Sequence, residues 1–128
     1  MGTSSDHVVE STLIIARNDE APRVARRFAR QAAAAALDAD AAETLELLVS
    51  ELVSAADGDR DTVLELSVAV HPDVVRVELL DASIHTPRPS ALPTEIDRFR
   101  AAILARLADG TGAHMTDNGC NHWLEVRR

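Results

Sequence analysis

The stretch that decides the fold is Leu47-Leu48-Val49-Ser50-Glu51-Leu52-Val53-Ser54-Ala55-Ala56. Its apolar residues recur at helical spacing, and the apolar stripe extends back one turn to Leu45. At about 100° per residue, Glu51 and Ala55 lie about 40° apart on the rim of that stripe. The stretch therefore predicts an amphipathic helix with a carboxylate and a methyl group one turn apart beside the core.

The segments around this helix predict a single domain over residues 1–128, in which residues 1–7 form a flexible polar tail. The order of the expected elements is β-α-α-β-β-α-β-β, which predicts an α+β fold: a two-layer sandwich of a mixed or antiparallel sheet with helices on one face. The expected elements are a strand over 8–15, a helix from 19 or 20 to 37, a helix over 40–56 opened by the capping box Asp40 to Glu43, strands over 62–70 and 74–80, a loop over 82–93, a helix from a cap at Thr94 to Gly110, and a hairpin that turns at Asn118-Gly119.

Composition and charge exclude several classes of partner. The chain has 128 residues, of which 46% are hydrophobic and only 2% aromatic, so we expect an aliphatic core without a stacking platform for bases. A net charge of -8 disfavours nucleic acid and anionic lipid, because both carry the same sign. Cys120 is the single cysteine, so no intrachain disulfide can form, and no stretch is typical of a signal peptide or a membrane span. We expect a cytoplasmic protein.

Four stretches, spread over about residues 10 to 126, together resemble a known family. They are 22–28, 43–53, 77–83 and 121–126. In order and spacing they are similar to the GHKL superfamily, which has the Bergerat ATPase fold of histidine kinases, and within it to the anti-sigma-factor serine kinases and their stand-alone actinobacterial relatives. The resemblance implies a histidine kinase-like ATPase domain.

The residues that this resemblance assigns to catalysis depart from the family pattern. Glu51 stands where the family places the glutamate that polarises the attacking hydroxyl or water. One turn on, the family's asparagine holds magnesium, but Ala55 has no oxygen for a cation. Asp81 stands where an aspartate accepts a hydrogen bond from the adenine amino group, and Ser83 replaces the glycine that follows it. The nucleotide site is therefore expected to be vestigial.

The phosphate lid of the family is also absent from this sequence. Arg98-Phe99-Arg100 stands where the family has Gly-x-Gly before a helix that binds the phosphates. Arg100 falls about 40° from an apolar stripe of its helix. One hypothesis is that Arg100 fills the phosphate space and pairs with Glu51 or Asp81. The other is that it lies at the edge of the stripe with its charge in water. That stripe consists of Ile96, Ile103 and Leu107.

Other chemical sites receive less support from the sequence. The first expected helix carries a basic ridge that consists of Arg23, Arg26, Arg27 and Arg30. The ridge lies opposite the expected apolar face of Val24, Phe28, Ala32 and Ala35. It either docks an acidic partner or is a solvated face. Pairing Met115 with His122 in the last hairpin puts His114 and His122 on opposite faces, and Cys120 with His122 gives only two ligands, so we expect no metal. Ser83, His85 and Asp81 lack the setting of a catalytic triad.

Three functions remain open. The favoured one is a regulatory protein-binding module of the anti-sigma or partner-switching type, a pseudokinase without cofactor. Its partner would be a sigma factor, an anti-anti-sigma factor or another GHKL subunit, and a homodimer is possible. The second is an active serine/threonine kinase that uses ATP and magnesium to phosphorylate an anti-anti-sigma factor, with Glu51 as base and the cation held by Asp57 or Asp59. The third is an anti-anti-sigma domain, against which the two successive helices argue. Whether the chain is an enzyme is left undecided, with loss of activity favoured.

Overall fold

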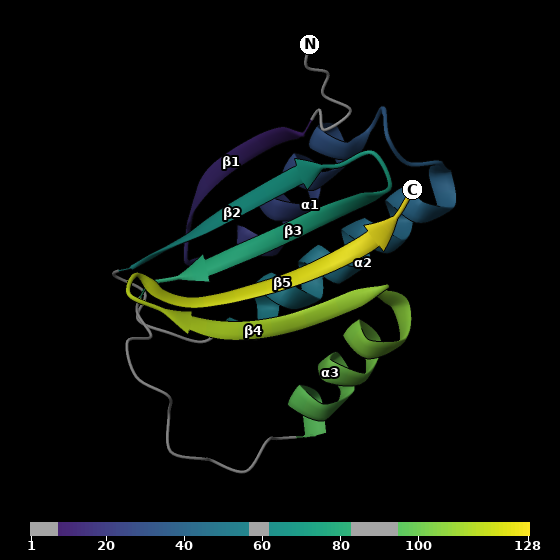
Figure 1. Ribbon diagram of the computed structural model, residues 1–128. Coiled ribbons are helices and arrows are strands. Elements are labelled where there is room, and N and C mark those ends of the chain that lie inside the picture. The colour runs from purple at the N-terminus through teal and green to yellow at the C-terminus, as the bar shows by residue number, and fades with distance from the viewer. Residues whose placement is uncertain (1–7, 57–61, 83–94) are drawn as a thin grey trace.

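Five antiparallel strands and three helices make up the described part of the chain. The computed structural model describes residues 8–56, 62–82 and 95–128, and at 95–98 and 100 it describes the backbone alone. Figure 1 shows the sheet, in which the spatial order of the strands is β1-β2-β3-β5-β4. In chain order the elements are β1 (Val9–Ala16), α1 (Ala21–Ala33), α2 (Ala39–Ala55), β2 (Val63–Val70), β3 (Val74–Asp81), α3 (Glu95–Leu107), β4 (Gly110–Thr116) and β5 (Gly119–Arg127).

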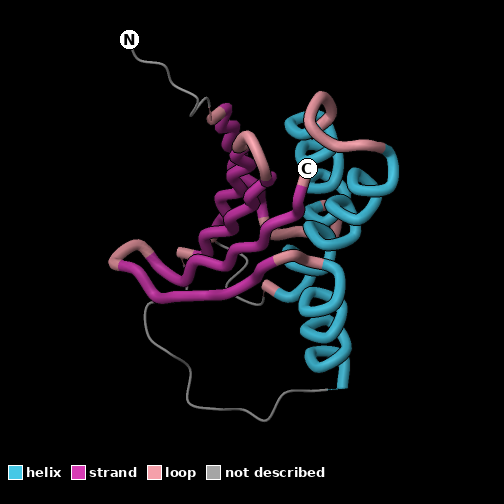
Figure 2. Tube along the Cα trace, turned by 45° about the vertical axis from the view of Figure 1, so that its right-hand side comes forward, coloured by secondary structure: helices cyan, strands magenta, loops and turns pink. Residues whose placement is uncertain are grey.

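The molecule has two layers, with the described helices on one face of the sheet (Figure 2). Each strand alternates its side chains between the two faces, and the face toward the helices receives the apolar set. The predicted α+β two-layer sandwich is confirmed, and every strand pairing in it is antiparallel.

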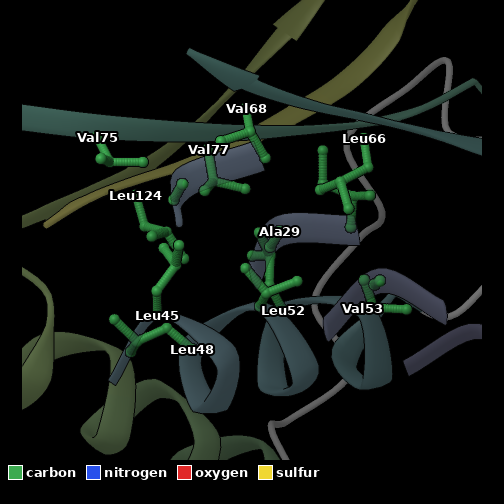
Figure 3. Close-up of a cluster of buried hydrophobic side chains, with 14 of the residues drawn as sticks. Ala29, Leu45, Leu48, Leu52, Val53, Leu66, Val68, Val75, Val77 and Leu124 are labelled. Carbon is green, nitrogen blue, oxygen red and sulfur yellow. The ribbon is translucent and has the colours of Figure 1, made fainter. Parts of the chain in front are cut away.

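The core lies between α2 and the three central strands. Four residues of the predicted stripe, Leu45, Leu48, Val49 and Leu52, are buried, and Val53 joins them. Figure 3 shows side chains of α2 pointing toward those of the strands. Burying a side chain of this size contributes about 1.5–3 kcal/mol, so this layer contact accounts for much of the stability. The strand side chains of the core include Leu64, Leu66, Val68, Val75, Val77, Leu79, Leu124 and Val126.

Helix α1 buries a different face from the one expected. The predicted apolar face, which included Val24 and Phe28, is exposed or only half-buried. A column of alanines is buried instead, because small side chains let the helix lie close to β1, β2 and α2. The column consists of Ala21, Ala25, Ala29 and Ala33.

Three predicted helix boundaries are corrected by capping and turn contacts. Helix α1 ends at Ala33, and a turn follows in which the amide of Ala36 donates to the carbonyl of Ala33. The cap of α2 is Asp38 rather than Asp40, because its carboxylate accepts the amide hydrogen of Ala41 at 2.8 Å. Helix α3 ends at Leu107, since β4 begins at Gly110.

The last hairpin turns one residue earlier than predicted. Asp117 and Asn118 form its two-residue turn, and Thr116 pairs with Gly119. The register differs by two residues from the predicted one, so His122 lies opposite Ala113 instead of Met115. A shift of two keeps each side chain on its face. Gly119 has φ +132°, and a Cβ there would lie 2.7 Å from the Cα of Ala82, so this position requires glycine.

The face of the sheet away from α1 and α2, seen in Figure 1, is the outer face. No described helix covers it, and Ile14 and Val63 are 57% and 47% exposed there. The guanidinium of Arg76 lies 4.3 Å from the ring centre of Trp123 on this face. A hollow of about 230 Å³ beside them is lined by Glu65, Ser67, Glu78, Leu80, Thr116, Asn118 and Asn121.

Candidate functional site

Asp81 is a charged residue with no exposed surface, which is rare for a carboxylate. It is the last residue of β3 and follows the inward-facing Val75, Val77 and Leu79 at intervals of two. Alternation along the strand therefore turns its carboxylate toward the helices. A buried carboxylate is unstable without strong hydrogen-bond donors, so its partners decide what this site can bind.

Arg17 provides such donors, and the sequence prediction missed it. It is the next inward-facing position of the chain after Ile15, and its side chain is only 6% exposed. Its Nη2 donates to Oδ1 of Asp81 in a buried ion pair. Its Nε donates to the hydroxyl of Thr62 at 2.9 Å. One guanidinium thus joins the ends of three segments.

The same guanidinium also reaches the end of α2. Its Nη1 lies 3.4 Å from the carbonyl oxygen of Ala56, the C-terminal cap of the helix that carries Glu51. Helix α2 has no basic residue in its last turn, so Arg17 brings to this negative helix end the cation that the helix itself lacks. Arg17 thus places one positive charge between two negative groups, the carboxylate of Asp81 and the C-terminal end of α2.

Of the predicted catalytic residues, Glu51 lies on α2 and is half-buried. Ala55 follows it by one turn and is exposed, so a methyl group occupies the position of the expected metal ligand. Ser54 is exposed as well. Asp57 and Asp59, the alternative magnesium ligands, lie outside the described residues.

Three further residues from the sequence analysis have no described side chain. Ser83 lies outside the described residues, as does His85. The backbone of Arg100 belongs to α3, but its side chain is not described, so the hypothesis that it pairs with Glu51 or Asp81 stays a prediction. The stripe used to orient it is only partly right, because Leu107 is 42% exposed while Ile103 packs on the core.

Much of the basic ridge of α1 makes contacts within the chain. Arg23 pairs with Glu20, the N-cap residue of the same helix. Arg26 donates to the hydroxyl of Ser50 at 3.3 Å, and Arg30 lies 4.0 Å from the carboxylate of Glu46. These contacts agree with a solvated face that also tethers α1 to α2.

Cys120 and His122 lie close to Asp81 on the inward face of β5. Cys120 is the β5 partner of Asp81, and its Sγ lies 3.4 Å from Nε2 of His122. Burial raises the pKa of the Cys120 thiol, and the charge of Asp81 raises it further. Burial lowers the pKa of His122, while the charge of Asp81 acts in the opposite direction.

Comparisons with known proteins do not assign the chain to a family. No protein-family model matches the chain, and no curated protein matches it. Among the described residues, no three His, Cys, Asp or Glu side chains are grouped so that they could hold a metal ion. No helix in that part of the chain is long and apolar enough to cross a membrane. What the site can do is therefore argued from its own contacts.

Proposed function

We propose that this protein is a regulatory protein-binding module of the anti-sigma or partner-switching type, related to the GHKL superfamily, that has lost ATP binding and kinase activity. It acts in the cytoplasm by binding a sigma factor, an anti-anti-sigma factor or another GHKL subunit. Neither nucleotide nor magnesium takes part. The resemblance of residues 10–126 supports the class of protein. The contacts of Asp81 support the loss of ATP binding and kinase activity.

The observation that carries the proposal is the buried ion pair between Arg17 and Asp81. In the family that the chain resembles, the aspartate at this position accepts a hydrogen bond from the adenine amino group. Here a guanidinium donates to that carboxylate and is itself held by Thr62 and Ala56. A neutral amino group would have to compete for Oδ1 with a charge-assisted bond in a buried setting, which is unfavourable.

The exposed methyl group of Ala55 also supports the loss of kinase activity, because it gives magnesium no ligand at this position. Magnesium requires oxygen ligands in near-octahedral geometry and loses its water reluctantly. Without an oxygen at this position, the helix offers Glu51 but no ligand one turn after it. Positioning and charge neutralisation make up nearly all of phosphoryl-transfer catalysis, so loss of the ion removes most of it.

The outer face of the sheet offers a surface for a partner. Exposed Ile14 and Val63 lie beside the hollow that contains Glu65 and Glu78. Apolar groups next to charged groups at a hollow are typical of protein interfaces. This face lies opposite the helices, so a partner bound there leaves the core undisturbed.

A nucleotide titration tests whether the protein has lost ATP binding. We expect that millimolar ATP with magnesium leaves the thermal unfolding midpoint unchanged, because a ligand present at 100 times its Kd would add about 2.7 kcal/mol to the stability. The variant Ala55→Asn, which restores the missing oxygen, should also show no shift while Arg17 remains paired. A clear shift of the wild-type protein would refute the proposed loss.

A binding assay tests the partner. Sigma factors, anti-anti-sigma factors and other GHKL proteins from the same cell are purified singly and mixed with the chain. We expect a complex with one of them by size-exclusion chromatography, formed equally with and without ATP, and no phosphoserine or phosphothreonine on the partner by mass spectrometry. ATP-dependent phosphorylation of a partner would establish the kinase instead. A stoichiometric phosphoserine on this chain after incubation with a cognate kinase would establish the anti-anti-sigma alternative.

A further inference from the structure

Most of the inward face of the sheet is aliphatic, but one corner of it gathers side chains that bind soft metals. Asp81 of β3 pairs with Cys120 of β5, and Cys120 pairs in turn with Met115 of β4. His122 is two residues from Cys120 and therefore points to the same face. Strands β4 and β5 thus bring a thiol, a thioether and an imidazole to adjacent positions, next to the carboxylate of Asp81 on β3.

The two closest donors have a spacing that suits a shared ion. Sγ of Cys120 lies 3.4 Å from Nε2 of His122. With a metal–sulfur bond of about 2.3 Å and a metal–nitrogen bond of about 2.0 Å, an ion bound to both would have an angle of about 105° between them. That angle lies near the values of tetrahedral and trigonal sites. The donors need little movement to bind an ion.

Met115 completes the set. It is directly opposite Cys120 across the β4–β5 pair, where Cβ atoms lie about 4.5–5.5 Å apart. Its unbranched side chain has three rotatable bonds, so the sulfur can approach an ion held by the other two residues. Met115 is 37% exposed, which leaves the site open to solvent.

We propose that Cys120, His122 and Met115 form a binding site for a soft monovalent metal ion, with Cu(I) as the chemical class. Thiolate and thioether ligands favour Cu(I), and imidazole accepts it as well. Zinc does not suit this corner, because only Cys120 and His122 are of the ligand types that zinc takes, and two such ligands do not complete its tetrahedron. Binding replaces the thiol proton of Cys120 with the metal and releases that proton to solvent, without any change of oxidation state.

The surroundings of the three donors agree with this assignment. The carboxylate of Asp81 lies on the same row of the sheet as the thiol. Its negative charge favours a cation nearby, although Arg17 offsets part of it. The site is independent of the proposed partner binding.

Competition against a coloured Cu(I) chelator, under anaerobic reducing conditions, tests the proposal. We expect one Cu(I) per chain. Loss of a residue that only hydrogen-bonds a metal ligand already costs metal sites about 10–100-fold in affinity. We therefore expect His122→Ala and Met115→Leu each to weaken binding at least tenfold, and Cys120→Ser to weaken it most. The matched control is His114→Ala, because His114 lies on the opposite face of the same hairpin and should leave the affinity unchanged.

Two outcomes would overturn the site. One is Cu(I) binding that depends on Cys120 but not on His122 or Met115, which would indicate a simple thiol adduct. The other is no stoichiometric binding by the wild-type protein. Thermal unfolding of each metal-free variant confirms that it is folded, and Met115→Leu exchanges two side chains of similar volume at a partly exposed position. X-ray absorption of the loaded protein should show sulfur and nitrogen ligands.

Discussion

At the scale of single residues, the buried pair of Arg17 and Asp81 is the feature that most constrains this molecule. Both side chains are almost completely removed from water. Desolvation of two charges is expensive, and their attraction and hydrogen bonds offset it only while both are present. The pair therefore specifies how β1, β3 and the end of α2 meet, more than it stabilises the fold.

Losing one member of the pair should therefore cost more than replacing both, which predicts how single and double variants differ in stability. Arg17→Met should lower the free energy of unfolding by about 3–5 kcal/mol, because the carboxylate of Asp81 loses its buried cation. The double variant Arg17→Met with Asp81→Leu should recover most of that loss, since apolar side chains of similar volume remove both desolvation costs. Urea denaturation of the three proteins measures the difference. A double variant less stable than Arg17→Met would show that the ion pair is a net source of stability.

The sequence could indicate Asp81 but not Arg17. Asp81 ends a run of alternating apolar residues and stands where the proteins that the sequence resembles have an aspartate, so both pattern and resemblance indicate it. Arg17 lies two strands away, and only the register of β1 on β2 and of β2 on β3 brings its side chain alongside. Those registers depend on pairings between segments that are far apart in the sequence. The one feature of the sequence that could have indicated Arg17 is its position, as a charged residue at the end of an apolar strand.

At the scale of elements, strands and helices with strong periodicity were predictable, and those with weak periodicity were not. The stripe of α2 is correct because leucine and valine leave one possible buried face. In α1, arginines mark the solvent side clearly, but alanine is found on both sides, so the apolar face was misplaced. In the last hairpin, Asn118-Gly119 matched a common turn, whereas close packing of Gly119 on β3 placed the turn one residue earlier.

The alanine column of α1 gives a prediction at this scale. Ala25 is fully buried between the helix and the sheet, so Ala25→Leu should lower the unfolding free energy by about 1–3 kcal/mol through overpacking. The matched control is Gln31→Leu, which places the same side chain at an exposed position of the same helix and should change stability by less than about 0.5 kcal/mol. Chemical denaturation followed by circular dichroism measures both. Equal stability of the two variants would mean that α1 does not pack as closely as described.

At the scale of the whole molecule, the sheet separates the two proposed binding sites. Its inward face carries the core and, at one corner, Asp81 with the proposed metal ligands. Its outer face carries exposed Ile14 and Val63 beside a polar hollow. A partner on one face and an ion on the other would not compete directly for the same residues. The sheet itself is the structure that both would share.

The layers also differ in how firmly they are held, which hydrogen exchange can measure. Helix α2 buries five side chains, whereas no described side chain of α3 is buried and only Ile103 and Leu104 are half-buried. Elements with few buried apolar contacts open locally, while those in the core exchange only through global unfolding. We therefore expect amides of 101–107 to exchange at least about tenfold faster than those of 45–53 and of β3. Mass spectrometry of peptides from these segments tests this, and equal protection of α3 and α2 would show that the third helix belongs to the same cooperative unit as the core.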